Sequence, residues 1–320
     1  MNVRPPFPVL LAIGGSDARD WFTAFQMQAP EREFRFWPDA IGNHSEIACA
    51  CVWKTPPGLL AQFPNLRAIF NLGAGVDGLL RDPDLPDVPI VRAVHPDLSM
   101  RMTEYVVLHV LMQHRRQRIY DAQQRDRIWK GHDQPAASEV CVGIMGFGTI
   151  GREAGGILRR IGFRVAGWSR TLQADPDIET YNGADGLERF LARTEILVCL
   201  LPHTPSTNGI LNLELLRKLN RQGALGGAYL INAGRGGLQI DVDILAALDE
   251  STLAGATLDV FPQEPLPGSS PLWTHPGVTI TPHNAGDLAP RALIAGILQQ
   301  IDAMERGFPL QHLVVRARGY

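Results

Sequence analysis

The most informative stretch of the chain is Glu139–Thr171, which reads EVCVGIMGFGTIGREAGGILRRIGFRVAGWSRT. Val140–Met145 is a short apolar run rich in β-branched residues, which is typical of a buried strand. Three glycines follow in the spacing G-x-G-x-x-G. Ile150–Gly162 has the length of a helix with apolar residues on one face, and Phe163–Trp168 has the pattern of a second strand. Strand, glycine-rich turn, helix and strand form the first half of a dinucleotide-binding unit.

Each of the three glycines has a separate physical reason. Gly146 allows a tight turn out of the strand, Gly148 lets a pyrophosphate approach the backbone, and Gly151 lets the helix pack close to the sheet. The first turn of the helix offers unpaired N–H groups and a partial positive charge to the phosphates. The alternative is an α/β turn of purely structural use. The cofactor-binding turn is expected to comprise Gly146, Phe147, Gly148, Thr149, Ile150 and Gly151.

The residues after the second strand indicate which dinucleotide binds. An NAD site usually carries Asp or Glu about 20 residues past the turn, where it bonds the ribose 2′-hydroxyl. Here Ser169, Arg170 and Thr171 offer one guanidinium, two hydroxyls and no carboxylate. A carboxylate would repel a 2′-phosphate, whereas a guanidinium attracts it. We therefore predict that NADPH is preferred and that NADH remains possible; the alternative is that Arg170 is a surface residue without a role.

Composition excludes several classes of protein. The 320 residues are enough for two domains, and an apolar fraction of 45% with a charged fraction of 20% is ordinary for a soluble globular protein. A net charge of −3 gives no reason to expect a nucleic acid or an anionic membrane as a partner. The apolar run Val9–Ile13 is too short for a signal-peptide core. We expect a cytoplasmic protein.

The four cysteines, Cys49, Cys51, Cys141 and Cys199, all lie in apolar runs. Cys49 and Cys51 alternate along a predicted strand, so they face the same side and do not pair easily with each other. Their spacing fits no zinc template. We expect buried free thiols and no metal site.

Strands and helices alternate along the rest of the chain, which predicts an α/β fold with doubly wound parallel sheets. A long helix is predicted over Met102–Arg118, with Tyr105, Val106, Leu108, His109, Leu111 and Met112 mostly inward. Polar Asp121–Ala137 is predicted to be a surface loop or a frayed helix, and the segment from Thr171 to Asn182 a loop. Ala289–Arg306 is predicted to be a helix that returns the chain to the first domain.

Three predicted strand ends carry charged residues beside glycine or proline: Asn232–Gly237, Leu258–Pro267 and Thr281–Gly286. In an open parallel sheet, ligands bind beyond the carboxyl ends of the strands. Taken singly, Arg235 could form a surface ion pair, Glu264 could be a loop carboxylate and His283 a structural histidine.

Together with the glycine turn, and in this order and separation, the three segments resemble the D-isomer-specific 2-hydroxyacid dehydrogenase family over nearly the whole chain. Within the family the chain is most similar to the reductases of glyoxylate and hydroxypyruvate. The similarity lies in Trp53, Leu72–Asp77, Trp168–Thr171, Pro271–Trp273 and Arg316–Tyr320.

The resemblance implies a catalytic triad of Arg235, Glu264 and His283. His283 would donate a proton to the carbonyl oxygen of a 2-keto acid, and Glu264 would orient its ring. Arg235 would polarise the carbonyl and bind the carboxylate through its fork of donors. His203 follows another strand and is expected to have no catalytic role.

Further site residues are implied by the same resemblance. The substrate is expected to meet Trp53, the amides of Gly73, Ala74 and Gly75, and the side chains of Arg235 and His283. The cofactor is expected to meet Pro202, Thr207 and Asp259, with Asp259 accepting from the nicotinamide amide.

The implied architecture is two Rossmann-like domains with the substrate in a cleft between them. Residues 1–98 and 288–320 would form a discontinuous substrate domain, and residues 99–287 the dinucleotide-binding domain. A homodimer with Met102–Arg118 near the contact is implied too. The expected activity is NADPH-dependent reduction of glyoxylate and hydroxypyruvate. The alternatives are a dehydrogenase of phosphoglycerate or of a longer 2-keto acid, and a dinucleotide-sensing, corepressor-like protein.

Overall fold

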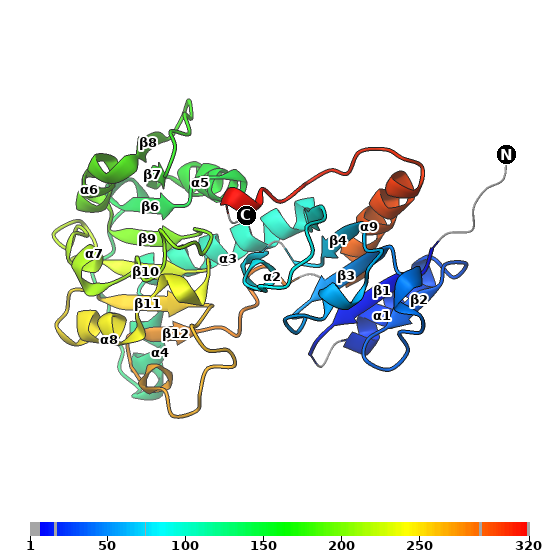
Figure 1. The fold of residues 1–320 in the computed structure, drawn as a ribbon. Coiled ribbons are helices and arrows are strands. Elements are labelled where there is room, and N and C mark those ends of the chain that lie inside the picture. The colour runs from blue at the N-terminus through cyan, green and yellow to red at the C-terminus, as the bar shows by residue number, and fades with distance from the viewer. Residues whose placement is uncertain (1–6, 16–17, 74, 288–289, 319–320) are drawn as a thin grey trace. The chain divides into compact units, whose positions relative to one another are not determined.

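The computed structural model describes residues 7–15, 18–73, 75–287 and 290–318. The chain divides into two compact units. The first unit comprises Met1–Pro96 and Leu288–Tyr320, and the second comprises Asp97–Asp287. Each unit contains one sheet of parallel strands with helices packed on it (Figure 1), so the predicted α/β class is confirmed. The predicted domain boundary, after residue 98, falls in the first turn of helix α3 (Pro96–His114).

The sheet of the first unit has the strand order β2-β1-β3-β4-β5. Its strands are β1 (Val9–Ile13), β2 (Phe34–Phe36), β3 (Cys49–Trp53), β4 (Ala68–Asn71) and β5 (Ile90–Arg92). Helices α1 (Ala18–Gln28) and α9 (Pro290–Glu305) share one hydrophobic cluster with one face of this sheet. The short helix α2 (Asp77–Leu80) and the 3₁₀ turn Leu60–Gln62 pack against the cluster on the other face.

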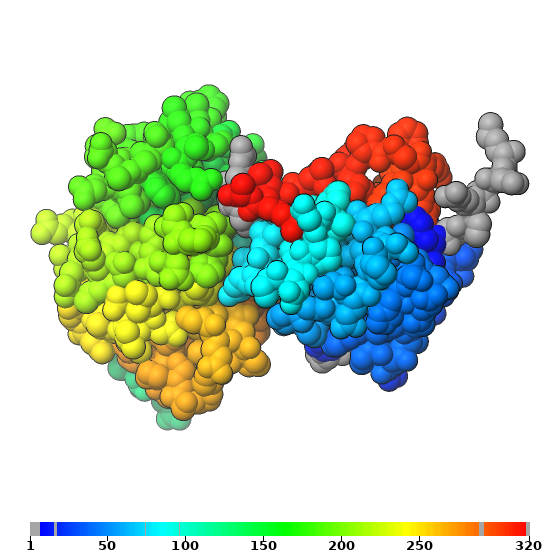
Figure 2. Space-filling model, viewed as in Figure 1, coloured from blue at the N-terminus to red at the C-terminus, as the bar shows by residue number. Residues whose placement is uncertain are grey.

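The sheet of the second unit has the order β12-β11-β10-β9-β6-β7-β8. Its strands are β6 (Cys141–Met145), β7 (Arg164–Ser169), β8 (Glu179–Asn182), β9 (Ile196–Cys199), β10 (Tyr229–Asn232), β11 (Gly255–Leu258) and β12 (Val278–Ile280). Helices α3 and α5 (Thr149–Ile161) cover one face, and α6 (Gly183–Arg193), α7 (Leu213–Arg217) and α8 (Asp241–Asp249) cover the other. The visible surface of this unit runs from green through yellow to orange (Figure 2).

The position of β6 in this sheet determines where a ligand can bind. Its neighbours are β9 on one side and β7 on the other, so the strand order reverses at β6. In open α/β sheets, ligands bind at such a switch point, beyond the carboxyl ends of the strands. The glycine turn begins at the carboxyl end of β6, and helix α5 starts after Gly148 and ends at Gly162, which has φ 114°.

The structure corrects several predicted elements. The single helix predicted over Met102–Arg118 is instead α3 followed by α4 (Gln117–Arg125), because Arg116 adopts a left-handed conformation with φ 56°. Helix α4 also occupies part of the segment predicted as a loop or frayed helix. Leu108, predicted to point inward, is 54% exposed.

Two short strands, β5 and β8, were not predicted. Strand β8 lies at the edge of its sheet in the segment predicted to be a loop. It has no fully buried residue, so it lacks the apolar run by which the inner strands were recognised. Strand β5 is only three residues long and begins directly after Pro89, so it too lacks a long apolar run.

All four cysteines are free and buried. Burial raises the pKa of each thiol, to about 12 for Cys199. Within the described ranges, no group of His, Cys, Asp and Glu side chains could hold a metal ion. No helix of those ranges has both the length and the apolar character that a bilayer span needs.

Candidate active site

The imidazole of His283 and the carboxylate of Glu264 form a direct hydrogen bond. The distance between His283 Nδ1 and Glu264 Oε2 is 2.7 Å. The other oxygen of Glu264 accepts from the backbone N–H of Phe261 at 3.0 Å, which holds the carboxylate in place. An ionised carboxylate only accepts, so Nδ1 carries the proton of this bond and Nε2 is directed to other partners. The side chains are 41% and 32% exposed, and a substrate can therefore reach the ring.

Arg235 lies just after the carboxyl end of β10, the strand next to β11. It follows β10, whereas Glu264 follows β11 and His283 follows β12, and these three strands are adjacent in the sheet. The turn after Arg235 packs directly on the segment that leads to Glu264, because a Cβ on Gly236 would lie only 1.9 Å from the carbonyl oxygen of Phe261. The Arg235 guanidinium donates to the carbonyl of Gly234 at 2.7 Å.

The carboxylate of Asp259 anchors the loop that carries His283. Asp259 is 1% exposed, and its oxygens accept from the hydroxyl of Thr281 at 2.6 Å and from the backbone N–H groups of Asn284 and Ala285 at 3.0 and 3.1 Å. The hydroxyl of Tyr105, on α3, lies 2.7 Å from that of Thr281. These contacts surround His283, whose φ of 55° is unusual for a residue with a side chain.

The three glycines of the turn after β6 differ in what a side chain would meet. Gly146 has φ 106°, and a Cβ there would lie 2.7 Å from the carbonyl carbon of Leu200. A Cβ on Gly151 would lie 2.5 Å from the carbonyl oxygen of Gly146. A Cβ on Gly148 would meet nothing within 4 Å. Two glycines are thus required by packing, whereas Gly148 borders open space where a pyrophosphate could approach the backbone.

These features can be compared with known proteins. The family model for the NAD binding domain of D-isomer specific 2-hydroxyacid dehydrogenases matches residues 107–285. Glyoxylate/hydroxypyruvate reductase A of Yersinia enterocolitica is 38% identical over 310 residues, which cover 95% of this chain and 97% of that protein.

The chain belongs to the D-isomer-specific 2-hydroxyacid dehydrogenase family.

Two solved structures are similar to this chain over nearly its whole length. The NADPH-dependent glyoxylate/hydroxypyruvate reductase of Sinorhizobium meliloti, in complex with NADP and sulfate, is 42% identical with a TM-score of 0.91, covering 98% of this chain and 100% of that one. A probable 2-hydroxyacid dehydrogenase of Rhizobium etli, in complex with NADP, HEPES and L(+)-tartaric acid, is 44% identical with a TM-score of 0.92, covering 99% and 100%.

In this dehydrogenase the end of β7 lies against the glycine turn. The backbone N–H groups of Gly146 and Phe147 both donate to the carbonyl of Trp168, at 2.9 and 3.1 Å. Ser169 ends β7, and its hydroxyl donates to the carbonyl of Thr171 at 2.8 Å. The residues predicted to bind a 2′-phosphate are therefore adjacent to those predicted to bind the pyrophosphate.

Pro202 and Thr207 belong to one tight turn after β9. The hydroxyl of Thr207 donates to the carbonyl of Pro202 at 2.8 Å and accepts from the N–H of Thr204 at 2.8 Å. Nε2 of His203 lies 2.9 Å from Asn208 Oδ1, and its ring packs against Gly237. His203 is thus engaged within this turn and its surroundings.

The residues expected on the substrate side lie in the first unit. The ring of Trp53 packs on Gly73, where a Cβ would be 2.1 Å from Trp53 Cζ3. The side-chain amide of Asn71 donates to the carbonyls of Gly73 and Gly75 at 2.6 and 3.0 Å. Ala74 lies outside the described residues.

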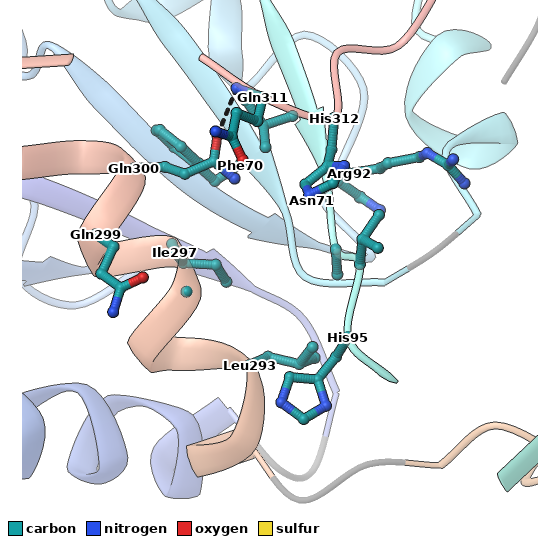
Figure 3. A pocket seen from close by; sticks show the side chains of 14 residues that line it. Phe70, Asn71, Arg92, His95, Leu293, Ile297, Gln299, Gln300, Gln311 and His312 are labelled. Atoms are coloured by element: carbon teal, nitrogen blue, oxygen red, sulfur yellow. Dashed lines mark hydrogen bonds between the residues drawn. The ribbon is translucent and has the colours of Figure 1, made fainter. Parts of the chain in front are cut away.

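A cavity of about 170 Å³ in the first unit lies beside Asn71 (Figure 3). It lies between α9 and the ends of β4 and β5, and its lining includes His95, Gln299, Gln300, Gln311 and His312. Gln300 Oε1 accepts from the backbone N–H of Gln311 at 2.9 Å. As far as the described residues show, its lining contains none of the predicted catalytic, cofactor or substrate residues.

Two residues that support the site had no predicted role. Thr281 belongs to one of the predicted strand-end segments, and Tyr105 is an inward residue of a predicted helix. A threonine that ends a strand directly before Pro-His is a weak signal for the first. Tyr105 and Thr281 are 176 residues apart in sequence, so nothing in the sequence pattern indicated their contact.

Proposed function

We propose that this enzyme uses NADPH to reduce small 2-keto acids, converting glyoxylate to glycolate and hydroxypyruvate to glycerate. The observation that carries the proposal is the 2.7 Å contact between His283 Nδ1 and Glu264 Oε2 at the strand ends that also carry Arg235. The relatives from Yersinia enterocolitica and Sinorhizobium meliloti, both named glyoxylate/hydroxypyruvate reductases, support the choice of substrates.

Glu264, His283 and Arg235 each have a separate role in the reduction of the keto group. Glu264 holds the ring of His283 through Nδ1, which leaves Nε2 to give its proton to the carbonyl oxygen. The guanidinium of Arg235 binds the substrate carboxylate and polarises the carbonyl. When bound, the reduced nicotinamide supplies the hydride that the carbonyl carbon receives. One hydride and one proton convert a 2-keto acid to a 2-hydroxy acid, and the substrate provides neither.

The first unit is proposed to supply the remaining substrate contacts. The backbone amides of Gly73, Ala74 and Gly75 would bind the carboxylate, as successive N–H groups in a turn do. Trp53 would form an apolar wall that restricts the size of the substrate side chain.

The cofactor residues are proposed from the turn after β6 and the loop after β7. The backbone from Gly146 to Gly151 would bind the pyrophosphate, and Ser169, Arg170 and Thr171 would bind the 2′-phosphate. Asp259 is proposed to accept from the nicotinamide amide; a carboxylate has about four acceptor positions, and three are used within the loop. The ratio of kcat/KM for NADPH to that for NADH tests the preference, and a ratio below one contradicts it.

The triad is tested by substitution. His283→Ala should lower kcat by roughly two orders of magnitude, as expected for loss of a general acid, while the Kd for NADPH changes little. His203→Ala is the matched control, because His203 lies in the same unit and is bonded to Asn208. Equal activity of the two variants would show that another group donates the proton.

A substrate panel separates the proposed activity from its alternatives. With NADPH, the enzyme should turn over glyoxylate and hydroxypyruvate faster than pyruvate and phenylpyruvate. Preference for phenylpyruvate or phosphohydroxypyruvate would indicate another dehydrogenase of the family. Tight NADPH binding without turnover of any keto acid would favour a dinucleotide sensor.

We further propose that the enzyme is a cytoplasmic homodimer. The apolar residues that support a subunit contact lie on α3, α4 and the segment that follows them. Leu108 is 54% exposed, Ile119 40%, Ile128 52% and Trp129 104%. Large exposed apolar patches are typical of interaction surfaces, and we assign these side chains to one. The cytoplasm is proposed because four free thiols suit a reducing compartment.

A further inference from the structure

Arg152 connects the glycine turn to the loop after β7. It lies in the first turn of α5, where its backbone N–H donates to the carbonyl of Gly148 at 2.9 Å. Its guanidinium donates to Oε1 of Gln173 at 2.9 Å and lies 5.8 Å from the centre of the Phe147 ring. The side chain therefore extends from α5 to the loop that follows Ser169.

This location is where the ribose of a bound dinucleotide is expected. In a dinucleotide-binding unit, the residue at the end of the second strand contacts the ribose 2′-oxygen. That strand is β7, and the turn after β6 is bonded directly to its last residues through the carbonyl of Trp168. The hydrogen bond between Arg152 and Gln173 makes a second connection between these segments, since Arg152 follows the glycine turn and Gln173 follows β7.

The surroundings of Arg152 differ in charge from those of Arg159 and Arg193 in the same unit. Arg159 pairs with Asp177 at 3.1 Å, and Arg193 pairs with Glu179. Arg152 pairs instead with the neutral amide of Gln173, and in the described part of the chain no carboxylate oxygen lies within 4.0 Å of its guanidinium nitrogens. Residues 169–173 are Ser, Arg, Thr, Leu and Gln, with no acidic side chain. Gln173 thus orients the guanidinium and leaves its charge in place.

We propose that Arg152 is a second cation for the ribose 2′-phosphate, beside Arg170, and that Gln173 positions it. A guanidinium has five N–H donors, and the bond to Gln173 uses one of them. A phosphate monoester carries about −1.5 to −2 charges at neutral pH, so two guanidinium groups match it better than one. The inference rests on the proposed NADPH preference and specifies which side chains produce it.

Binding of adenosine fragments tests the inference without turnover. The affinities of 2′,5′-ADP and 5′-ADP for the purified enzyme are measured by calorimetry. Arg152→Gln should weaken 2′,5′-ADP about tenfold or more, since it removes a charge-assisted bond, and should leave 5′-ADP within about twofold. Gln173→Glu keeps Arg152 but places a carboxylate on it, and it should weaken 2′,5′-ADP by a similar factor.

Arg159→Gln is the matched control, because Arg159 lies on the same helix but pairs with an exposed carboxylate. It should leave both affinities unchanged. In kinetics, Arg152→Gln should lower kcat/KM for NADPH about tenfold and leave that for NADH nearly unchanged. Thermal unfolding identifies any variant that has lost its fold. If Arg152→Gln does not fold, Gln173→Glu provides the test by itself.

The outcomes separate this inference from the proposed function. If the wild type binds 2′,5′-ADP and 5′-ADP equally, the NADPH preference itself fails. If the wild type prefers 2′,5′-ADP and both variants keep that preference, only the inference fails. Equal weakening of the two fragments would also overturn it, because it would assign Arg152 to a part of the nucleotide that both share.

Discussion

At the scale of single residues, the turn after β6 separates glycines needed by the fold from a glycine needed by the ligand. Gly146 and Gly151 leave no room for a methyl group, and Gly148 has open space beside it. All three were predicted from their spacing, but the spacing alone could not tell which of them faces a ligand. That distinction depends on how Leu200 and the carbonyl of Gly146 pack around the turn, which only the folded chain defines.

Gly148→Ala should therefore fold normally and bind NADPH poorly. The loss of unfolding free energy should stay below about 1 kcal/mol, because the methyl group meets nothing. The Kd for NADPH should rise tenfold or more, because the methyl group would occupy the space of the pyrophosphate. Gly151→Ala is the contrasting variant and should lose about 1–3 kcal/mol through overpacking. Calorimetry and thermal unfolding give the two quantities, and unchanged NADPH affinity in Gly148→Ala would contradict the role.

Two buried histidines on α3 predict how stability depends on pH. Burial lowers the pKa of His109 and of His114, and the neighbouring Arg115 and Arg116 lower that of His114 further. The unfolded chain then binds more protons than the folded chain below about pH 6.5, the usual pKa of histidine. Stability is complete above that pH and is lost as the pH falls towards the lower pKa of the folded state.

His109→Leu should flatten this dependence. The wild type should lose at most about 1.4 kcal/mol per pH unit for each histidine in the window below pH 6.5. The variant should lose less between pH 7 and pH 5.5, and the double variant with His114→Leu less again. Urea unfolding at the two pH values measures the difference. An unchanged slope in the double variant would show that other groups control the acid response.

At the scale of elements, the loop after β12 is held by a chain of side chains from three elements. Asp259 follows β11, Thr281 follows β12 and Tyr105 lies on α3. The order of the three strand ends could be predicted, because buried strands have continuous apolar runs and parallel strands present their carboxyl ends at one edge. The anchoring of the loop could not, since it depends on hydrogen bonds between distant segments. The same limit applies to Arg116, whose left-handed conformation divides the helix predicted there.

Thr281→Val should displace the imidazole of His283 from its position in the site. Valine has the same shape as threonine but cannot donate to Asp259 or bond to Tyr105. We expect kcat to fall about tenfold and the Kd for NADPH to change by less than about threefold, because the imidazole is displaced while the cofactor turn is untouched. Tyr105→Phe removes only the outer bond and should have a smaller effect. Wild-type kcat in Thr281→Val would show that the backbone bonds to Asp259 hold the loop alone.

At the scale of the whole molecule, the apolar residues from α3 to Trp129 predict a subunit contact. Trp129→Ser combined with Leu108→Asp should shift the proposed homodimer towards monomers, because each replaces an exposed apolar side chain with a polar one. Sedimentation velocity at micromolar concentration measures the change. Met27→Ser is the control, since Met27 is 78% exposed on α1. A variant that remains dimeric would place the contact elsewhere.

The four buried thiols make the two units distinguishable in a chemical experiment. Cys49 and Cys51 lie in the first unit, and Cys141 and Cys199 in the second. Because each thiol is inaccessible and its thiolate form is disfavoured, an alkylating reagent can modify only molecules that have opened. Peptide mass spectrometry after timed alkylation would therefore measure the rate at which each unit opens. It would also show whether NADPH slows the opening of one unit or of both.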